Sequence, residues 1–291
     1  MISQQFLVCD SSTLANFKGW AQAIDTFFST SGWAQSSDTG QVNWSTLSTV
    51  PGSGAYVYSI WQPNDGLTNF YVKMEYGNTG GAANPSIRIT IGTTTNGAGT
   101  LGGFVIGPQV LNPNTTTSAS TTATYECDFS GAAGRIGALL WRTGPTGNTI
   151  PQLFAIERSV NSSGSYTSSH VTLFTNSTAS NRQYQATIVF GVGVPPNAIP
   201  PSSNGGWIAR VTNLGAVAFN GSIPLDTCAP FVGFFDQPLT MVGISSAADL
   251  AEGITFTLTL YGSTRTYLPT KVLGSAIYQG GFGGCVCMRY D

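Results

Sequence analysis

Few residues of this chain are of the types that carry out catalysis. His170 is the only histidine among the 291 residues, and it stands in the segment Ser-Ser-His-Val. A triad of serine, histidine and an acid could use it, since distant residues can converge on one imidazole. However, no Gly-x-Ser-x-Gly segment between a strand and a helix supplies the nucleophile. We therefore predict that His170 lies in a loop or at a strand edge and has no catalytic role.

Two cysteines near the end of the sequence are spaced like half of a zinc site. Structural zinc needs four ligands, and neither a second close pair nor a nearby histidine completes Cys285 and Cys287. Residues two apart on a strand point to one face, so we expect both thiols to pack together in the core. An intermolecular metal or disulfide stays the alternative. The five cysteines are odd in number and widely spaced, which fits no disulfide framework of a small secreted domain.

The acidic residues offer two spacings that resemble paired catalytic carboxylates. Glu126 and Asp128 share one face of a predicted strand, and Asp249 lies near Glu252. Glycoside hydrolysis uses such a pair, but neither pair has the aromatic and charged setting typical of that chemistry. Ion pairing or a solvated loop is the better interpretation. Asn64-Asp65-Gly66 also falls short of the ligand spacing of a calcium loop. The sequence predicts no enzyme, no metal site and no cofactor.

Composition limits the partners of the chain. Charged residues make up 8% of the sequence, against roughly 25% in an ordinary soluble domain. Hydroxyl and amide side chains must therefore provide the polar surface, and such groups pack against neighbours without desolvating ions. The formal net charge is -2 and the arginines are scattered, so no specific binding of nucleic acid is predicted. With neither a signal peptide nor an apolar run of membrane-spanning length, we expect synthesis in a reducing cytoplasm and no membrane partner.

One amphipathic helix is predicted early in the chain. Ser11 and Ser12 are candidate N-caps, and Gly32 is a candidate left-handed cap at the other end. A helix face rich in aromatic rings cannot lie free in solvent, so we expect it to dock on its own β domain or on another subunit. The large apolar residues recur every three or four positions, at Leu14, Phe17, Trp20, Ala21, Ile24, Phe27 and Phe28.

Beyond Trp33 the helical spacing gives way to alternation of apolar and polar residues. Alternation predicts antiparallel strands with one buried and one wet face. Clusters such as Asn96-Gly97 separate the strands as turns. The predicted strands are residues 56–61, 70–76, 87–91, 184–190 and 254–260. The predicted fold class is mainly β, an antiparallel β-sandwich of jelly-roll-like kind with one N-terminal amphipathic α-helix.

The chain divides into four predicted segments. They are an N-terminal helix and docking segment (1–45), a β-sandwich lobe (46–193), a proline-rich connection (194–206) and the remaining strands with a C-terminal arm (207–291). The last segment belongs either to the same sandwich or to a separate lobe. Its glycine-rich stretch before residues 285–290 is typical of a hinge that leads to a short strand. That strand could add to the sheet of a neighbouring subunit or complete its own sheet.

Several phrases in the first third of the chain resemble the opening of tailed-bacteriophage virion proteins. Those proteins have, in order, a helix, an Asp-Thr-Gly-Gln turn, a tyrosine-rich strand, a Lys-x-Glu-Tyr-Gly strand and an Asn-Pro-Ser-Ile strand. The matching phrases, within residues 13–92, include Phe17-Lys18-Gly19-Trp20, Asp38-Thr39-Gly40-Gln41, Lys73-Met74-Glu75-Tyr76-Gly77 and Asn84-Pro85-Ser86-Ile87. The resemblance implies a structural protein of the tail, neck or baseplate region and brings no catalytic residues with it.

Composition and resemblance together predict a virion component, assembled in the host cytoplasm from copies of itself and other virion proteins. Low charge suits the burial of large subunit interfaces. The residues that we expect at such contacts are Phe17, Trp20, Phe27, Phe282 and Tyr290.

Two alternatives for the function stay open. A capsid decoration (cement) protein would have similar chemistry but sit on capsid subunits. A module that binds a receptor or a host-surface glycan would instead need exposed aromatic side chains, for which Trp61, Trp141 and Trp207 are the candidates.

Overall fold

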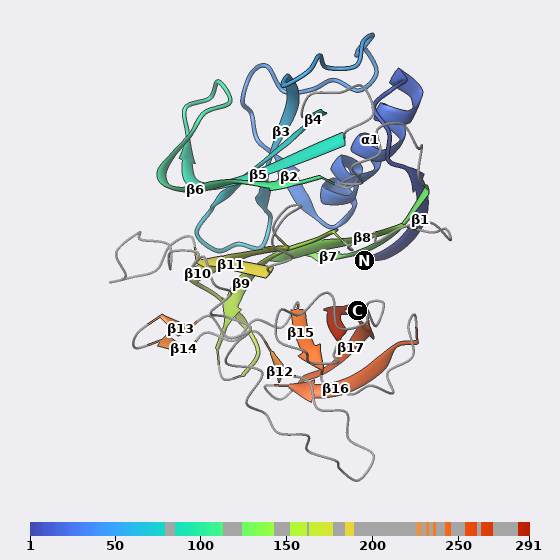
Figure 1. The fold of residues 1–291 in the computed structure, drawn as a ribbon. Helices are drawn as coiled ribbons and strands as arrows, with labels where there is room; N and C mark the ends of the chain where they lie inside the picture. Colours follow the sequence, from blue (N-terminus) through green and yellow to red (C-terminus); the bar gives the residue numbers. More distant parts are fainter. Residues whose placement is uncertain are drawn as a thin grey trace.

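The computed structural model describes residues 1–78, 85–112, 124–142, 152–161, 163–176, 184–188, 226–227, 231–232, 235–236, 242–245, 254–260, 263–269 and 285–291. These residues are mainly β, with antiparallel sheets and one α-helix, which confirms the mainly β, antiparallel part of the predicted class. Figure 1 shows a central sheet with the helix on one face and a further sheet on the other. In the described part of the chain, no helix is long and apolar enough to cross a membrane.

The N-cap of helix α1 (Leu14–Thr30) is Thr13, the residue that follows the predicted caps Ser11 and Ser12. The Oγ1 of Thr13 accepts a hydrogen bond from the main-chain N–H of Asn16 at 3.1 Å. The prediction of Ser11 or Ser12 is therefore corrected. The reason is that Asp10 accepts a hydrogen bond from the Ser12 main-chain N at 2.7 Å, which forms a turn ahead of the helix.

The C-terminal end and the buried face of α1 follow the predicted pattern. Gly32 has a φ of +86°, the left-handed conformation that glycine adopts without steric cost. Asp25 is also buried on this face, although its charge gave no reason to expect it there. The buried apolar residues are Phe17, Trp20, Ala21, Ile24, Phe27 and Phe28.

The N-terminal sheet is an antiparallel meander in the order β2-β3-β4-β5-β6. Its alternating residues give each strand one face toward the core, as with Val72, Met74 and Tyr76 on β4. The three strands predicted in this region are confirmed. The bounds are β2 (Trp33–Gln35), β3 (Tyr56–Pro63), β4 (Tyr71–Asn78), β5 (Pro85–Thr95) and β6 (Leu101–Leu111).

The central sheet has the strand order β1-β7-β8-β9-β10-β11, all antiparallel, with β1 at one edge. Neighbours in sequence are therefore neighbours in space in both sheets, apart from β1. This pairing gives no support to a jelly-roll-like strand order. The bounds are β1 (Ile2–Val8), β7 (Thr124–Ala132), β8 (Arg135–Arg142), β9 (Gln152–Val160), β10 (Tyr166–Asn176) and β11 (Tyr184–Ile188).

Helix α1 lies between the N-terminal and central sheets and shares one core with both (Figure 1). On the central sheet, the rings of Phe27 and Phe129 lie 5.0 Å apart. On the N-terminal sheet, the ring of Phe28 stacks on Trp61 with centroids 5.5 Å apart. The helix therefore docks on its own chain, which decides between the two docking sites predicted for it.

The C-terminal sheet has the order β12-β15-β18-β17-β16 and lies on the face of the central sheet opposite to α1 (Figure 1). Strand β18 sits inside this sheet, paired with β15 and β17, so it completes its own sheet and is not a free arm. The predicted strand near residue 254 is confirmed as β16. The bounds are β12 (Asp226–Thr227), β15 (Val242–Ser245), β16 (Phe256–Leu260), β17 (Ser263–Pro269) and β18 (Cys285–Arg289), beside a separate pair β13 (Phe231–Val232) and β14 (Phe235–Asp236).

Charged side chains join the central and C-terminal sheets. Arg135 on β8 is 3% exposed, and its Nη2 lies 3.3 Å from Asp291 Oδ1. Arg289 Nε donates to the same carboxylate. Glu157 on β9 and Tyr267 on β17 are both buried. The burial of Tyr267, and then the negative charge of Glu157, raise the pKa of Tyr267. This face of the central sheet is thus polar at the contact, whereas the face toward α1 is apolar.

Parts of the predicted segment boundaries fall outside the described residues. The proline-rich connection at 194–206 is one of them, so the division at that point stays a prediction. Residues 1–45 contribute β1 to the central sheet and β2 to the N-terminal sheet, with α1 between them. This segment is therefore built into both sheets.

Candidate assembly interface

Strand β1 forms an edge of the central sheet. Among the described strands its one neighbour is β7, with the register running from Ile2 opposite Ser130 to Val8 opposite Thr124. An edge strand presents main-chain N–H and C=O groups on its open side, and another strand can pair with them.

The hydrogen-bond phase of the ladder shows which groups of β1 are on the open side. Gly131 N donates to Met1 O at 2.9 Å, and Met1 N donates back to Gly131 O. In an antiparallel pair such doubly bonded residues alternate with residues whose main-chain groups point away from the partner. Residues 1, 3, 5 and 7 therefore bond to β7. The main-chain groups of Ile2, Gln4 and Phe6 point to the open edge.

The side chains of β1 do not protect this edge. Natural edge strands are commonly guarded by charges, prolines or bulges, and residues 1–8 contain no charged side chain and no proline. The exposed fractions are 55% for Met1, 44% for Ile2 and 63% for Phe6. The described part of the chain has five large apolar side chains of such exposure, and three of them lie here. Within the described residues, the edge is thus unpaired and carries exposed apolar side chains.

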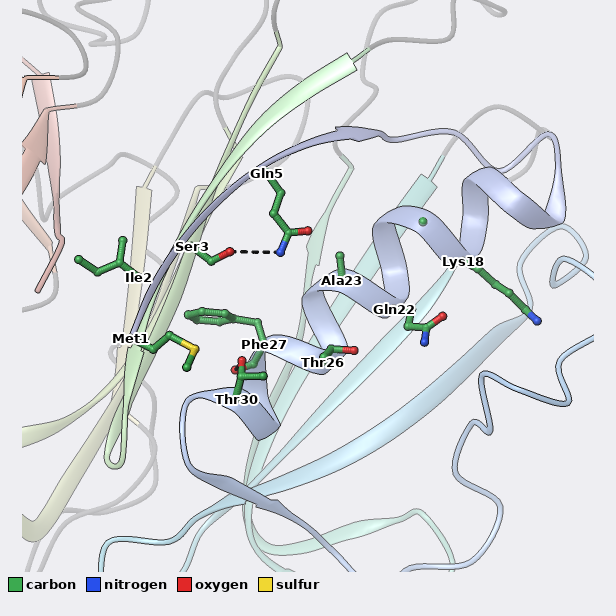
Figure 2. A pocket seen from close by; sticks show the side chains of 11 residues that line it. Met1, Ile2, Ser3, Gln5, Lys18, Gln22, Ala23, Thr26, Phe27 and Thr30 are labelled. Carbon is green, nitrogen blue, oxygen red and sulfur yellow. Dashed lines mark hydrogen bonds between the residues drawn. The ribbon is translucent and has the colours of Figure 1, made fainter.

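A groove of about 540 Å³ runs between β1 and the outward face of α1. Figure 2 shows Ser3 and Gln5 on the side of β1 that faces the helix, where Gln5 Nε2 donates to Ser3 Oγ at 3.2 Å, and Ile2 on the other side. The helix contributes mostly small and uncharged side chains, and Lys18 has the one charged side chain of the lining. The groove therefore suits an uncharged polypeptide segment better than an ionic ligand.

The predicted acid pair on β7 lies next to this edge. Gln4 Nε2 donates to Glu126 Oε1 at 2.8 Å and to Asp128 Oδ1 at 3.2 Å. Asp128 is fully buried on the face toward the C-terminal sheet. The two carboxylates do share a strand face as predicted, and a side-chain amide bridges them where a glycosidase would need room for a sugar.

Three of the residues predicted at subunit contacts are instead in the core of the chain itself. Phe17 and Trp20 are 0% exposed and Phe27 is 4% exposed, packed by α1 against the two sheets. The prediction is corrected because the chain supplies its own partner for the helix. Tyr290 follows β18, and its main-chain N donates to Thr266 O at 2.7 Å. Phe282 lies outside the described residues.

The aromatic residues proposed for sugar stacking have different outcomes. Trp61 is 5% exposed, and its Nε1 donates to Asp25 Oδ1 at 2.9 Å, so its ring is not available to a ligand. The side chains of Trp141 and Trp207 lie outside what the structure describes, and so does that of His170.

The positions of some cysteines can be described. Cys9 and Cys127 are buried, and burial of Cys127, followed by the neighbouring Cys9 thiol, raises the pKa of Cys127 well above its ordinary 9.0. Cys285 and Cys287 occupy β18, and their side chains are outside the described set. Among the described residues, no three His, Cys, Asp or Glu side chains are grouped to hold a metal.

A second hollow, formed by the loop of residues 35–45, is polar and open. The amide of Gln41 is engaged with main-chain groups around the hollow. Gln41 Nε2 donates to Ser36 O at 2.8 Å and to Asp38 O at 3.0 Å, while Gln41 Oε1 accepts from Ile60 N at 2.7 Å. These contacts hold the loop on β3, and their role is structural.

The unprotected edge was not predicted from the sequence. Residues 2–8 read Ile-Ser-Gln-Gln-Phe-Leu-Val, in which polar and apolar residues occupy both faces. The feature that could have predicted this edge is the lack of charged residues around Ile2 and Phe6. Comparison of the chain with protein-family models, curated proteins and solved structures found no match.

Proposed function

We propose that the chain is a structural subunit of a tailed-phage virion and assembles as a homo-oligomer in the tail, neck, fibre or baseplate region. The observation that carries the proposal is the open, uncharged edge of β1 with its exposed apolar side chains. A protein that works as a dilute monomer is expected to guard such an edge against its own copies. A subunit that is meant to pair has no need of that protection.

The composition supports the same proposal. With 8% charged residues, most of the surface consists of hydroxyls, amides and apolar atoms. Burying such a surface between subunits leaves few charges to desolvate. The resemblance of residues 13–92 to phage virion proteins points to the particle as the place of assembly. We further propose that the N-terminal and central sheets form a β-sandwich closed by α1, and that no part of the chain is catalytic.

Capsid decoration is the alternative that differs least in chemistry. A decoration protein would bind capsid subunits through the same kind of uncharged surface, but it would not need to pair with itself. A glycan-binding module is less well supported, since Trp61 is buried and bonded to Asp25.

The native mass of the purified chain tests self-assembly. Multi-angle light scattering over a wide range of concentrations should give a discrete oligomer that dissociates only on dilution. A monomer at every concentration would contradict the homo-oligomer and would favour the decoration protein. In that case, mixing the chain with purified capsids and measuring co-sedimentation would test the alternative directly.

A further inference from the structure

We propose that β1 pairs with β1 of a second copy of this chain, antiparallel and about a two-fold axis at Gln4. The two central sheets would then form one continuous sheet. This inference rests on the proposed self-assembly and names the site and the register through which it begins.

The main-chain geometry of the edge fits this pairing. Ile2, Gln4 and Phe6 carry the outward-pointing groups, and they are spaced two residues apart. With Gln4 opposite its own copy, Ile2 comes opposite Phe6 of the second copy and Phe6 opposite Ile2. All three pairs are then of the doubly bonded kind, so the contact gains about six main-chain hydrogen bonds.

The side chains of β1 match themselves in the same register. On the face with Gln4, the exposed Ile2 meets the exposed Phe6 of the other copy. On the face toward α1, Ser3 meets Gln5 and Met1 meets Leu7. Apolar residues thus meet apolar ones, and polar residues meet polar ones, at every position from 1 to 7. This symmetry about Gln4 favours a second copy over an unrelated strand, because a two-fold contact requires a self-complementary surface.

Charge and space also permit the pairing. Residues 1–8 carry no charged side chain, so two copies of the strand meet without burying a side-chain ion. The added strand would lie along the groove between β1 and α1, which has a volume of about 540 Å³. Its Ser3 and Gln5 would face Gln22 and Thr26, both exposed on the helix.

A pair of variants at Gln4 isolates the main-chain contribution. Gln4→Pro and Gln4→Ala both remove the side chain that bridges Glu126 and Asp128. Only proline removes the outward N–H, and it leaves the ladder to β7 intact because that N–H does not bond to β7. Two hydrogen bonds across the axis are lost, so we expect the dimer dissociation constant to rise about thirty-fold for Gln4→Pro relative to Gln4→Ala.

A cross-link tests the register without relying on a proline variant that folds. Doubly bonded residues have Cα atoms about 5.5 Å apart, a separation that a disulfide can bridge. Gln4→Cys should therefore form a covalent dimer under mild oxidation. In the same register Phe6 lies about four residues, roughly 13 Å, from Phe6 of the other copy, so Phe6→Cys should not cross-link.

The outcomes separate this inference from the proposed function. A dimer that Gln4→Pro weakens and Gln4→Cys locks supports the pairing. An oligomer that Gln4→Pro leaves as stable as Gln4→Ala, with no cross-link at position 4, overturns the pairing and keeps self-assembly. A wild-type chain that is monomeric at every concentration, with no cross-link at position 4, overturns both.

Discussion

Trp61 Nε1 donates a hydrogen bond to Asp25 Oδ1 at 2.9 Å, which ties a strand of the N-terminal sheet to a carboxylate on α1. The same carboxylate accepts from Trp44 Nε1 at 2.7 Å, from Tyr76 OH at 3.3 Å and from Ser59 Oγ. All four donors are neutral. Burial, and then the charge of Asp25, raise the pKa of Tyr76 well above its ordinary value. One buried anion therefore organises the contact between the helix and the sheet.

Replacing Asp25 with asparagine should destabilise the fold. The carboxylate offers only acceptors, and the amide NH2 would point a donor at one of the donors around it. An unsatisfied donor in a buried site costs about 1–3 kcal/mol, and more when a charged acceptor is lost. We expect Asp25→Asn to lower the free energy of unfolding by about 3 kcal/mol, measured by urea denaturation. The exposed neighbour Thr26→Ala should change it by less than about 0.5 kcal/mol. Equal effects of the two variants would show that the four hydrogen bonds contribute little.

The ion pair of Arg158 and Asp65 should couple strongly in a double-mutant cycle. Arg158 Nε lies 2.5 Å from Asp65 Oδ2, and the two side chains are 0% and 8% exposed. Arg158 also donates to Thr68 O at 2.8 Å, so it holds the β3–β4 loop against β9. Breaking a buried pair by removing one partner costs about 3–5 kcal/mol. We expect Asp65→Asn and Arg158→Met each to cost about that much, and the double variant to cost far less than their sum.

A second ion pair provides the matched control for that cycle. Lys73 and Glu75 lie 3.5 Å apart on the surface of β4, with side chains 20% and 19% exposed. The coupling energy of such a pair is about 0–1 kcal/mol, because solvent screens both charges. A coupling energy for Arg158 and Asp65 no larger than that of the surface pair would mean that the buried pair does not position the loop.

The helix and the N-terminal sheet could be predicted because their cause is local. Up to Phe28 the apolar residues recur at helical spacing, and from Tyr56 onward apolar and polar residues alternate. Both patterns reflect which face of the helix or strand is buried. The partner of a buried face is not local. Phe27 packs on Phe129, about a hundred residues later in the chain, and nothing near Phe27 distinguishes that partner from another subunit. This is why the aromatic helix face was placed at a subunit contact.

Strand β1 was missed for a related physical reason. Its residues face solvent on one side and a groove on the other, so neither face is uniformly apolar. Its pairing with β7 joins residues 116 to 128 positions apart, which no local pattern records. The buried Asp25 escaped prediction in the same way, since its donors Trp44, Ser59 and Tyr76 come from separate segments.

The loop that holds Asp38 should make stability depend on pH in the acid range. Burial alone raises the pKa of Asp38, but hydrogen bonds from Thr95, Gly99 and Ser36 outweigh it and hold the pKa below the ordinary value of 3.8. A carboxyl with a lowered pKa in the folded state stabilises the fold above its unfolded pKa, and this stability is lost as pH falls through the folded value. The urea midpoint of the wild type should therefore fall as pH drops below about 3.8.

Two variants assign that acid sensitivity to Asp38. Asp38→Asn should be less stable than the wild type at neutral pH, and the difference should shrink as pH falls below about 3.8, because the variant has no proton to take up there. Thr95→Val removes a hydrogen bond to the carboxylate, which raises the folded pKa of Asp38 toward its unfolded value. The loss of stability in acid should then be smaller and should be complete at a higher pH than in the wild type. A difference between wild type and Asp38→Asn that stays constant with pH would contradict the assignment.

The thiols of Cys9 and Cys127 should be unreactive in the folded protein. They are 1% and 0% exposed, and burial followed by the neighbouring Cys9 thiol raises the pKa of Cys127 well above 9.0. At mildly alkaline pH the thiolate of Cys127 is therefore scarce, and reagent cannot reach either buried thiol without an opening of the fold. We expect iodoacetamide to leave both residues unmodified in native protein, as read by peptide mass spectrometry, and to modify both in urea. Rapid native labelling of Cys127 would show that the edge formed by β1 opens readily from β7. That opening would also remove the rigid strand on which pairing with a second copy depends.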